Sequence, residues 1–170
     1  DGLNSSLSGP NAVGAMAVYG GKLYISSGNS NGVYGQIWQY DETTWTKIGG
    51  NGTNGLANVP TYSALTVYGN QLCAGNGLQV GAAQVWCWTG SGNWTKIGGD
   101  GVNSSWATAA TATKSIGSLI VYNGSLYAGM ADTATLAGEV WKWNGTAWTQ
   151  VGGNSLNSGW ADSTYGMMSA

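Results

Sequence analysis

The segment Trp45-Thr46-Lys47-Ile48-Gly49-Gly50 decides how the rest of this sequence is understood, because the chain repeats it. It returns as Trp94-Thr95-Lys96-Ile97-Gly98-Gly99 and as Trp148-Thr149-Gln150-Val151-Gly152-Gly153. A period of about 50 residues is typical of arrays in which each repeat is one supersecondary unit that packs on its neighbours. We therefore expect a single domain, 1–170, with repeats at approximately 1–50, 51–99 and 100–153.

Each repeat holds four short apolar segments divided by Gly and Asn turns, and none has a helical period. The first two segments are joined by Gly20-Gly21, Gly69-Asn70 or Asn123-Gly124, which tolerate the positive φ of a two-residue hairpin. The third segment, Gln36–Tyr40 in the first repeat, carries two aromatic residues two positions apart, so both rings point to one face of the strand. The pattern predicts an all-β, β-propeller-like array of four-stranded antiparallel blades, with the aromatic pairs packed between blades.

One stretch of the first repeat has a familiar order. Ala17-Val18-Tyr19-Gly20-Gly21-Lys22-Leu23-Tyr24 is followed by Trp38-Gln39-Tyr40-Asp41 and then by Thr44-Trp45-Thr46-Lys47. This succession resembles the kelch-type propeller repeat, and the resemblance covers nearly the whole chain. It departs where that family usually has a Gly-Gly doublet after the second strand, since Ser26-Ser27-Gly28 stands there. Kelch-like propellers serve as binding modules and occasionally as enzyme scaffolds, so the resemblance leaves the function open.

The chain carries one strand more than three blades require. Residues 154–170 echo residues 1–17, and three blades are fewer than the four or more that usually complete a ring. We expect this surplus strand to pair with an open blade of another copy, giving a head-to-tail filament or a ring. The donor residues would be Tyr165, Met167 and Met168, and the acceptor residues Val13, Met16 and Val18. The alternatives are a strand that pads an incomplete four-bladed ring, and a fragment of a longer chain.

The two cysteines occupy one cross-strand site of the second repeat. Cys73 stands where the other repeats have Tyr24 and Tyr127, and Cys87 stands where they have Gln39 and Lys142. Both members of a predicted pair are thus cysteine in one blade only, which predicts a disulfide and an oxidising, extracellular setting. The alternative is two independent buried thiols. Two thiols without histidine make a metal site unfavourable, and we expect no metal and no cofactor.

Composition argues against several classes of function. Only 7% of the residues are charged, the net charge is −2 and there is no histidine. No cluster of Lys exists to bind nucleic acid, and no apolar run is long enough for membrane insertion. There is no imidazole base, and Asp132 and Glu139 are the only local pair of acids that could face each other across a cleft, so we expect no enzyme. Because the chain starts at Asp1, we expect a processed mature form.

Two tryptophans are candidates for binding sugars, and six Asn-x-Ser/Thr sequons are candidates for carrying them. Trp106 and Trp160 lie between blades, where an indole could stack on a glycan, although packing over a blade interface explains them as well. Candidate glycosylation sites are Asn4, Asn51, Asn93, Asn103, Asn123 and Asn144. Our expectation is an extracellular structural subunit that self-assembles through its terminal strands. The alternative is a carbohydrate-binding, lectin-like propeller.

Overall fold

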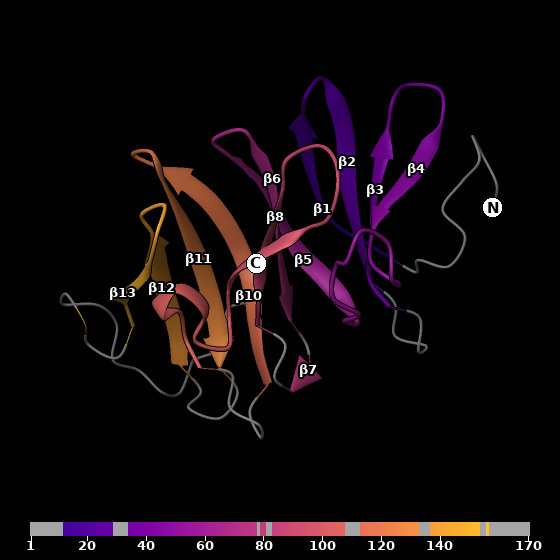
Figure 1. Ribbon diagram of the computed structural model, residues 1–170. Helices are drawn as coiled ribbons and strands as arrows, with labels where there is room; N and C mark the ends of the chain where they lie inside the picture. Colours follow the sequence, from indigo (N-terminus) through magenta and orange to yellow (C-terminus); the bar gives the residue numbers. More distant parts are fainter. Residues whose placement is uncertain are drawn as a thin grey trace.

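The computed structural model describes residues 12–28, 34–77, 79–80, 83–107, 113–132, 137–153 and 156. These residues form three curled antiparallel blades that lie side by side in chain order (Figure 1). The all-β, propeller-like array expected from the repeats is confirmed, and no α-helix occurs in the described part of the chain. No helix among these residues is long and apolar enough to cross a membrane.

Blade 1 is a four-stranded meander. It consists of β1 (Ala12–Tyr19), β2 (Lys22–Gly28), β3 (Gln36–Tyr40) and β4 (Trp45–Gly49). Each strand pairs antiparallel with the next one along the chain, because the connections are too short for any other pairing. In Figure 1 this blade is drawn in indigo and purple.

Blade 2 repeats the meander with one insertion. Its strands are β5 (Thr61–Tyr68), β6 (Gln71–Gly77), β8 (Val85–Trp88) and β9 (Thr95–Gly98). The short β7 (Gln79–Val80) leaves the blade and pairs with the start of β10 in blade 3, a contact that the repeat pattern does not predict. A 3₁₀ turn, η1 (Val102–Ser104), follows β9.

Blade 3 consists of β10 (Thr113–Tyr122), β11 (Ser125–Asp132), β12 (Ala137–Trp143) and β13 (Trp148–Gly152). The first strands of the three blades are neighbours, with β5 packed between β1 and β10 (Figure 1). Every first strand bulges at the same place, at Gly14, Ser63 and Gly117. Because the bulge recurs, the twist that it adds is part of the repeat.

The first and third hairpin turns have the backbone angles that their residues predict. Gly20 and Gly21 have φ values of 55° and 75°, and Asn123 and Gly124 have φ values of 46° and 71°. These are the positive values that a type I′ turn demands at both central positions. The surplus strand expected at 165–170 lies outside the described residues.

Candidate assembly faces at the two ends of the array

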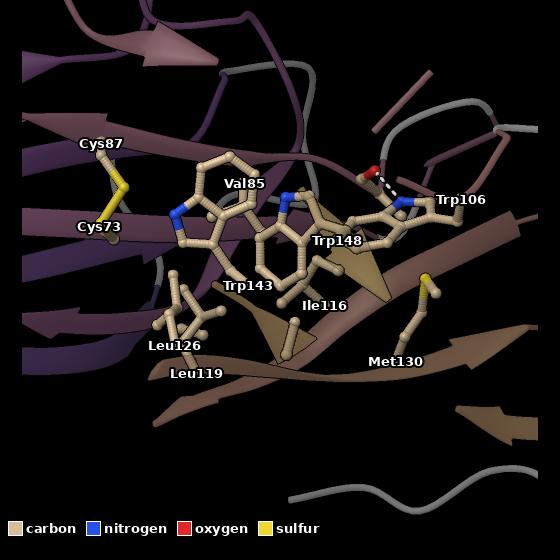
Figure 2. Close-up of a cluster of buried hydrophobic side chains, with 13 residues drawn as sticks. Cys73, Val85, Cys87, Trp106, Ile116, Leu119, Leu126, Met130, Trp143 and Trp148 are labelled. Atoms are coloured by element: carbon tan, nitrogen blue, oxygen red, sulfur yellow. Dashed lines mark hydrogen bonds between the residues drawn. A yellow bond between two sulfur atoms is a disulfide. The ribbon is translucent and has the colours of Figure 1, made fainter. Parts of the chain in front are cut away.

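Each blade has two faces, and the chain closes only some of them. We call the side toward the preceding blade the leading face and the side toward the following blade the trailing face. On β5 of blade 2, Tyr62 and Leu65 point to the leading face and join a core cluster with Tyr24, Ile37 and Ile48 of blade 1. On β10 of blade 3, Ile116 and Leu119 do the same against blade 2 (Figure 2). These two contacts are the closed interfaces.

At both closed interfaces a hydrogen bond from an indole N–H links the two blades. Trp94 Nε1 donates to the Ile48 carbonyl of blade 1 at 2.9 Å, and Trp148 Nε1 donates to the Ile97 carbonyl of blade 2 at 2.8 Å. A buried indole needs such a partner, since leaving the N–H unpaired would cost about 1–3 kcal/mol. The tryptophans of the second and third repeat motifs therefore each donate a hydrogen bond to the preceding blade.

The predicted disulfide is confirmed, and it belongs to the second closed interface. Cys73 and Cys87 are direct cross-strand partners and are bonded, with a Cα–Cα distance of 4.1 Å. Both cysteines are buried beside Leu126 and Trp143 of blade 3 (Figure 2). A bond between cysteines with a sequence separation of 14 stabilises the fold by about 3 kcal/mol in the chain-entropy view.

The equivalent cross-strand sites of blades 1 and 3 hold other residue pairs in place of the two cysteines. In blade 1 the Tyr24 hydroxyl donates to Gln39 Oε1 at 3.0 Å, and burial raises the pKa of that hydroxyl. In blade 3 Tyr127 is paired in register with Lys142. The sequence alignment of these three cross-strand sites therefore holds in the structure.

The leading face of blade 1 is exposed along β1 and buried beyond it. Val13, Met16 and Val18 are 53%, 66% and 69% exposed, while Ile25 and Trp38, the cross-strand partners of Met16 on the same face, are buried. Met16 corresponds to Leu65 and Leu119, which are 8% and 9% exposed. The three residues expected to accept another strand thus form an exposed apolar row.

The trailing face of blade 3 is open as well, and our sequence analysis did not single it out. Ile120 and Tyr122 on β10 are 63% and 62% exposed, whereas the corresponding Ala17 and Tyr19 of blade 1 are half-buried against blade 2. The alternation along β10 could have revealed these residues, because side chains next to the buried Leu119 must point to the opposite face.

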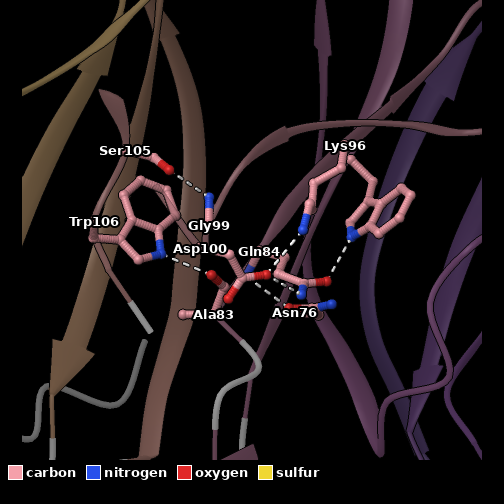
Figure 3. Close-up of polar contacts among 9 residues, drawn as sticks. Asn76, Ala83, Gln84, Lys96, Gly99, Asp100, Ser105 and Trp106 are labelled. Carbon is pink, nitrogen blue, oxygen red and sulfur yellow. Dashed lines mark hydrogen bonds and ion pairs between the residues drawn. The ribbon is translucent and has the colours of Figure 1, made fainter. Parts of the chain in front are cut away.

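A polar cluster closes the loop end between blades 2 and 3. Gln84 Nε2 donates to Asp100 Oδ2 at 3.0 Å, and Lys96 Nζ forms an ion pair with the same oxygen at 2.9 Å (Figure 3). Ser105 Oγ accepts from the Gly99 amide at 2.8 Å. These groups therefore bond to one another, whereas Nδ2 of the buried Asn76 in the same cluster has no hydrogen-bond partner among the described residues (Figure 3).

Trp106, the first candidate for glycan binding, belongs to this loop end and is buried. It is 3% exposed, packs edge-on against Trp141 and Trp148, and donates from Nε1 to the Ala83 carbonyl at 2.7 Å (Figure 3). No ring face remains for a sugar, so Trp106 is a core residue that packs over the blade interface. The second candidate, Trp160, lies outside the described residues.

Five of the six sequon asparagines fall in the described part of the chain, and all five are exposed. Two of them have structural contacts: Asn144 Oδ1 accepts the amides of Thr146 and Ala147, and Asn103 Nδ2 donates to the Ile97 carbonyl. Asn51, Asn93 and Asn123 occupy turns or loops. Asn4 and the expected donor residues Tyr165, Met167 and Met168 lie outside the described residues.

The acidic side chains form no cluster in the described residues: no group of three or more His, Cys, Asp or Glu side chains could hold a metal there. Asp41 sits in the exposed turn between β3 and β4, where the Thr43 hydroxyl and the amides of Thr44 and Thr43 hold its pKa below the ordinary value. Glu139 is buried and accepts from Trp141 Nε1 at 2.8 Å.

Comparisons with known proteins give a fold and no family. No family model matches the chain, and no curated protein matches it. A Bombyx mori β-fructofuranosidase of glycoside hydrolase family 32, solved as a mutant in complex with sucrose, matches with a TM-score of 0.51 at 14% identity, over 84% of this chain and 34% of that one. A second structure of that enzyme matches with a TM-score of 0.47 at 12% identity, with the same coverage. The chain spans about a third of the length of these structures.

This comparison corrects the prediction that the chain is not an enzyme. The likeness is one of fold, and the protein that shares the fold is a glycosidase. The argument from the absence of histidine and the spread of the acids therefore does not exclude catalysis by a chain of this architecture.

Proposed function

We propose that the chain is an extracellular structural subunit that self-assembles head to tail into a filament or a ring. The observation that carries this proposal is the pair of exposed apolar rows, along β1 and along β10, at the two ends of the blade array. The positions of Val13 and Met16 are buried in blades 2 and 3, and the position of Val18 is half-buried in blade 2 and 37% exposed in blade 3. The positions of Ile120 and Tyr122 are half-buried in blade 1, where blade 2 covers the trailing face.

The physical argument is that such a face is costly to leave in water. Burying a large apolar side chain stabilises a structure by about 1.5–3 kcal/mol, so a contact that covers these side chains gains several such contributions. The two faces differ from each other, which makes the contact heterologous. Contacts of this kind propagate as a filament, or close as a ring where the rotation allows.

Strand exchange is the second part of the proposal. Residues 165–170 of one copy would add to β1 of the next, satisfying main-chain groups at the exposed edge. The extracellular setting is supported by the Cys73–Cys87 disulfide, since disulfides persist in oxidising compartments. The kelch-type resemblance stays a prediction, and the lectin-like alternative now depends on Trp160 alone.

Negative-stain electron microscopy with light scattering tests the proposal. We expect particles larger than the 17.4 kDa monomer, and we expect Met16→Asp to reduce them to monomers with an unchanged circular dichroism spectrum. Tyr34→Asp is a matched control, because Tyr34 is an exposed aromatic residue that precedes β3 and belongs to neither exposed row. A wild-type protein that stays monomeric at high concentration overturns the proposal. Deleting 165–170 tests strand exchange separately.

A further inference from the structure

We infer that Asn144 carries an N-linked glycan, and that the turn between β12 and β13 selects it by leaving its side-chain nitrogen free for the sugar. Asn144-Gly145-Thr146 is a sequon, and Asn144 is exposed in that turn (Figure 1). The inference goes beyond assembly. It rests on the extracellular setting of the proposed function, since N-linked glycans are found on the surface loops of secreted proteins.

The Asn144 side chain is held in the turn by its oxygen. Oδ1 accepts the amides of Thr146 and Ala147, both at 2.9 Å, and the Thr146 hydroxyl donates to the same oxygen at 2.9 Å. Nδ2 makes no hydrogen bond to the described part of the chain. A glycan is attached at Nδ2, so all three hydrogen bonds of the turn survive the modification.

The modification is a group transfer to Nδ2 from a lipid-linked oligosaccharide pyrophosphate. The bond between the sugar C1 atom and the pyrophosphate oxygen breaks, and a bond between C1 and Nδ2 forms. The pyrophosphate leaves with the bonding electron pair, and Nδ2 gives up one of its two protons. The product is a secondary amide that keeps Oδ1, which is the atom that the turn uses. The folded turn therefore holds the sugar without rearranging.

Blade 1 has the same turn with a carboxylate in place of the amide. Asp41 Oδ1 accepts the Thr43 amide at 3.1 Å, the Thr44 amide at 2.8 Å and the Thr43 hydroxyl at 2.7 Å. Asp41 thus occupies the position of Asn144 and lacks only the nitrogen that would carry the sugar. The two turns form a matched pair within one chain, one able to accept a glycan and the other not.

Asn103, by contrast, uses the atom that would carry the sugar. Its Nδ2 donates to the Ile97 carbonyl at 3.1 Å, and Trp148 Nε1 donates to the same carbonyl at 2.8 Å across the closed interface between blades 2 and 3. A sugar on this nitrogen would begin beside the carbonyl that links the two blades. We therefore expect Asn103 to stay unmodified, although its sequon is exposed.

The other described sequons have structural explanations of their own. A Cβ atom at Gly55 would lie 3.7 Å from Asn93 Nδ2, and Trp94, the middle residue of that sequon, is 4% exposed. Asn51 and Asn123 have φ values of 52° and 46°, a left-handed conformation that asparagine tolerates better than most residues. Turn geometry accounts for these two residues without a sugar.

Mass spectrometry of tryptic peptides tests the site, because the chain has five lysines and no arginine. Trypsin gives peptide 143–170, whose only sequon is that of Asn144, and peptide 97–114, whose only sequon is that of Asn103. The full chain is produced in eukaryotic cells behind a cleavable signal peptide, and both cells and medium are analysed. We expect a glycan on peptide 143–170 that peptide N-glycosidase removes, and none on peptide 97–114.

Exchanging the side chains of the two matched turns tests the role of the turn. Asn144→Asp should abolish the glycan on peptide 143–170 with an unchanged circular dichroism spectrum, because the Oδ1 acceptor is kept. Asp41→Asn creates a sequon with Thr43 and should place a glycan on peptide 23–47, which has no sequon in the wild-type chain.

The outcomes separate this inference from the proposed assembly. A peptide 143–170 without a glycan overturns the inference, whether or not the chain assembles. Peptide 97–114 modified as fully as peptide 143–170, or an Asp41→Asn chain without a glycan on peptide 23–47, overturns selection by the turn. Chains that carry the glycan on Asn144 and stay monomeric overturn assembly and support the site.

Discussion

Met16 and Leu119 hold the same position in blades 1 and 3, and their surroundings could hardly differ more. Leu119 is 9% exposed because blade 2 covers it, while Met16 is 66% exposed on the open face of blade 1. The two strands have the same pairing, the same bulge and the same alternation. Burial at this position is therefore decided by the neighbouring blade rather than by the strand.

The largest expected effect comes from truncating this position in both blades. Leu119→Ala leaves a cavity in the closed interface and should lower the free energy of unfolding by about 2–5 kcal/mol. Met16→Ala should change it by less than about 0.5 kcal/mol in dilute solution, since an exposed side chain loses little on truncation. Urea denaturation of both variants measures the difference. Equal losses would show that the β1 face is covered in solution.

A smaller effect is expected from the repeat-motif tryptophans. Trp94→Phe removes the N–H that donates to the Ile48 carbonyl, which still accepts from Asn54 Nδ2, so the loss should be that of one hydrogen bond, about 0.5–1.5 kcal/mol. Trp45 has no preceding blade among the described residues and is half-buried against Tyr40, so Trp45→Phe should cost less than about 0.5 kcal/mol. Thermal unfolding of the two variants ranks them. A Trp45 variant as unstable as the Trp94 variant would contradict this difference between the open and closed ends.

The smallest effect concerns matching turns at the open and closed ends. Asp41 Oδ1 and Asn144 Oδ1 each accept the amides of the residues two and three positions later. The pKa of Asp41 is depressed in the folded chain, so its extra contribution is present above the ordinary value of 3.8 and is lost as the pH falls through the folded value. Asp41→Asn should therefore unfold slightly earlier than wild type at pH 7.

The pH dependence of the Asp41→Asn effect shows whether the charge of Asp41 stabilises the folded chain. The difference in unfolding temperature between Asp41→Asn and wild type should shrink as the pH falls below about 4, because the unfolded wild-type chain then takes up a proton at Asp41 that the folded chain still resists. A difference that grows in acid would show that the charge of Asp41 does not stabilise the turn.

Local patterns were enough to predict most of the backbone. The third strand of blade 1 was expected at Gln36–Tyr40 and is observed there, and the Gly20-Gly21 hairpin has the expected dihedral angles. The Cys73–Cys87 bond followed from comparing repeats, because cross-strand partners are fixed by register once the hairpin is known. The short β7 pairing was missed, since it joins blades rather than neighbouring segments.

The candidate site was predicted only in part. Val13, Met16 and Val18 were identified from the echo between the chain ends, and their exposure agrees with an accepting surface without testing it. Trp106 could not be assigned from its position in a linker, because an apolar ring there serves a sugar or a core equally well. Ile120 and Tyr122 were not identified from the sequence. Their counterparts in blade 1, Ala17 and Tyr19, are half-buried, and the repeat pattern alone does not show that blade 3 leaves this face exposed.

The sequence by itself determined the blade: its period, its strands, its turns and its disulfide all follow from interactions between residues close in the chain or paired across a hairpin. Only the tertiary structure decided which faces of the blades are covered. Identical strand patterns lead to burial at Leu65 and Leu119 and to exposure at Met16, because hydrophobic burial depends on what packs against a surface. A repeated pattern describes every blade alike, and the ends of the array differ from its middle only in their neighbours.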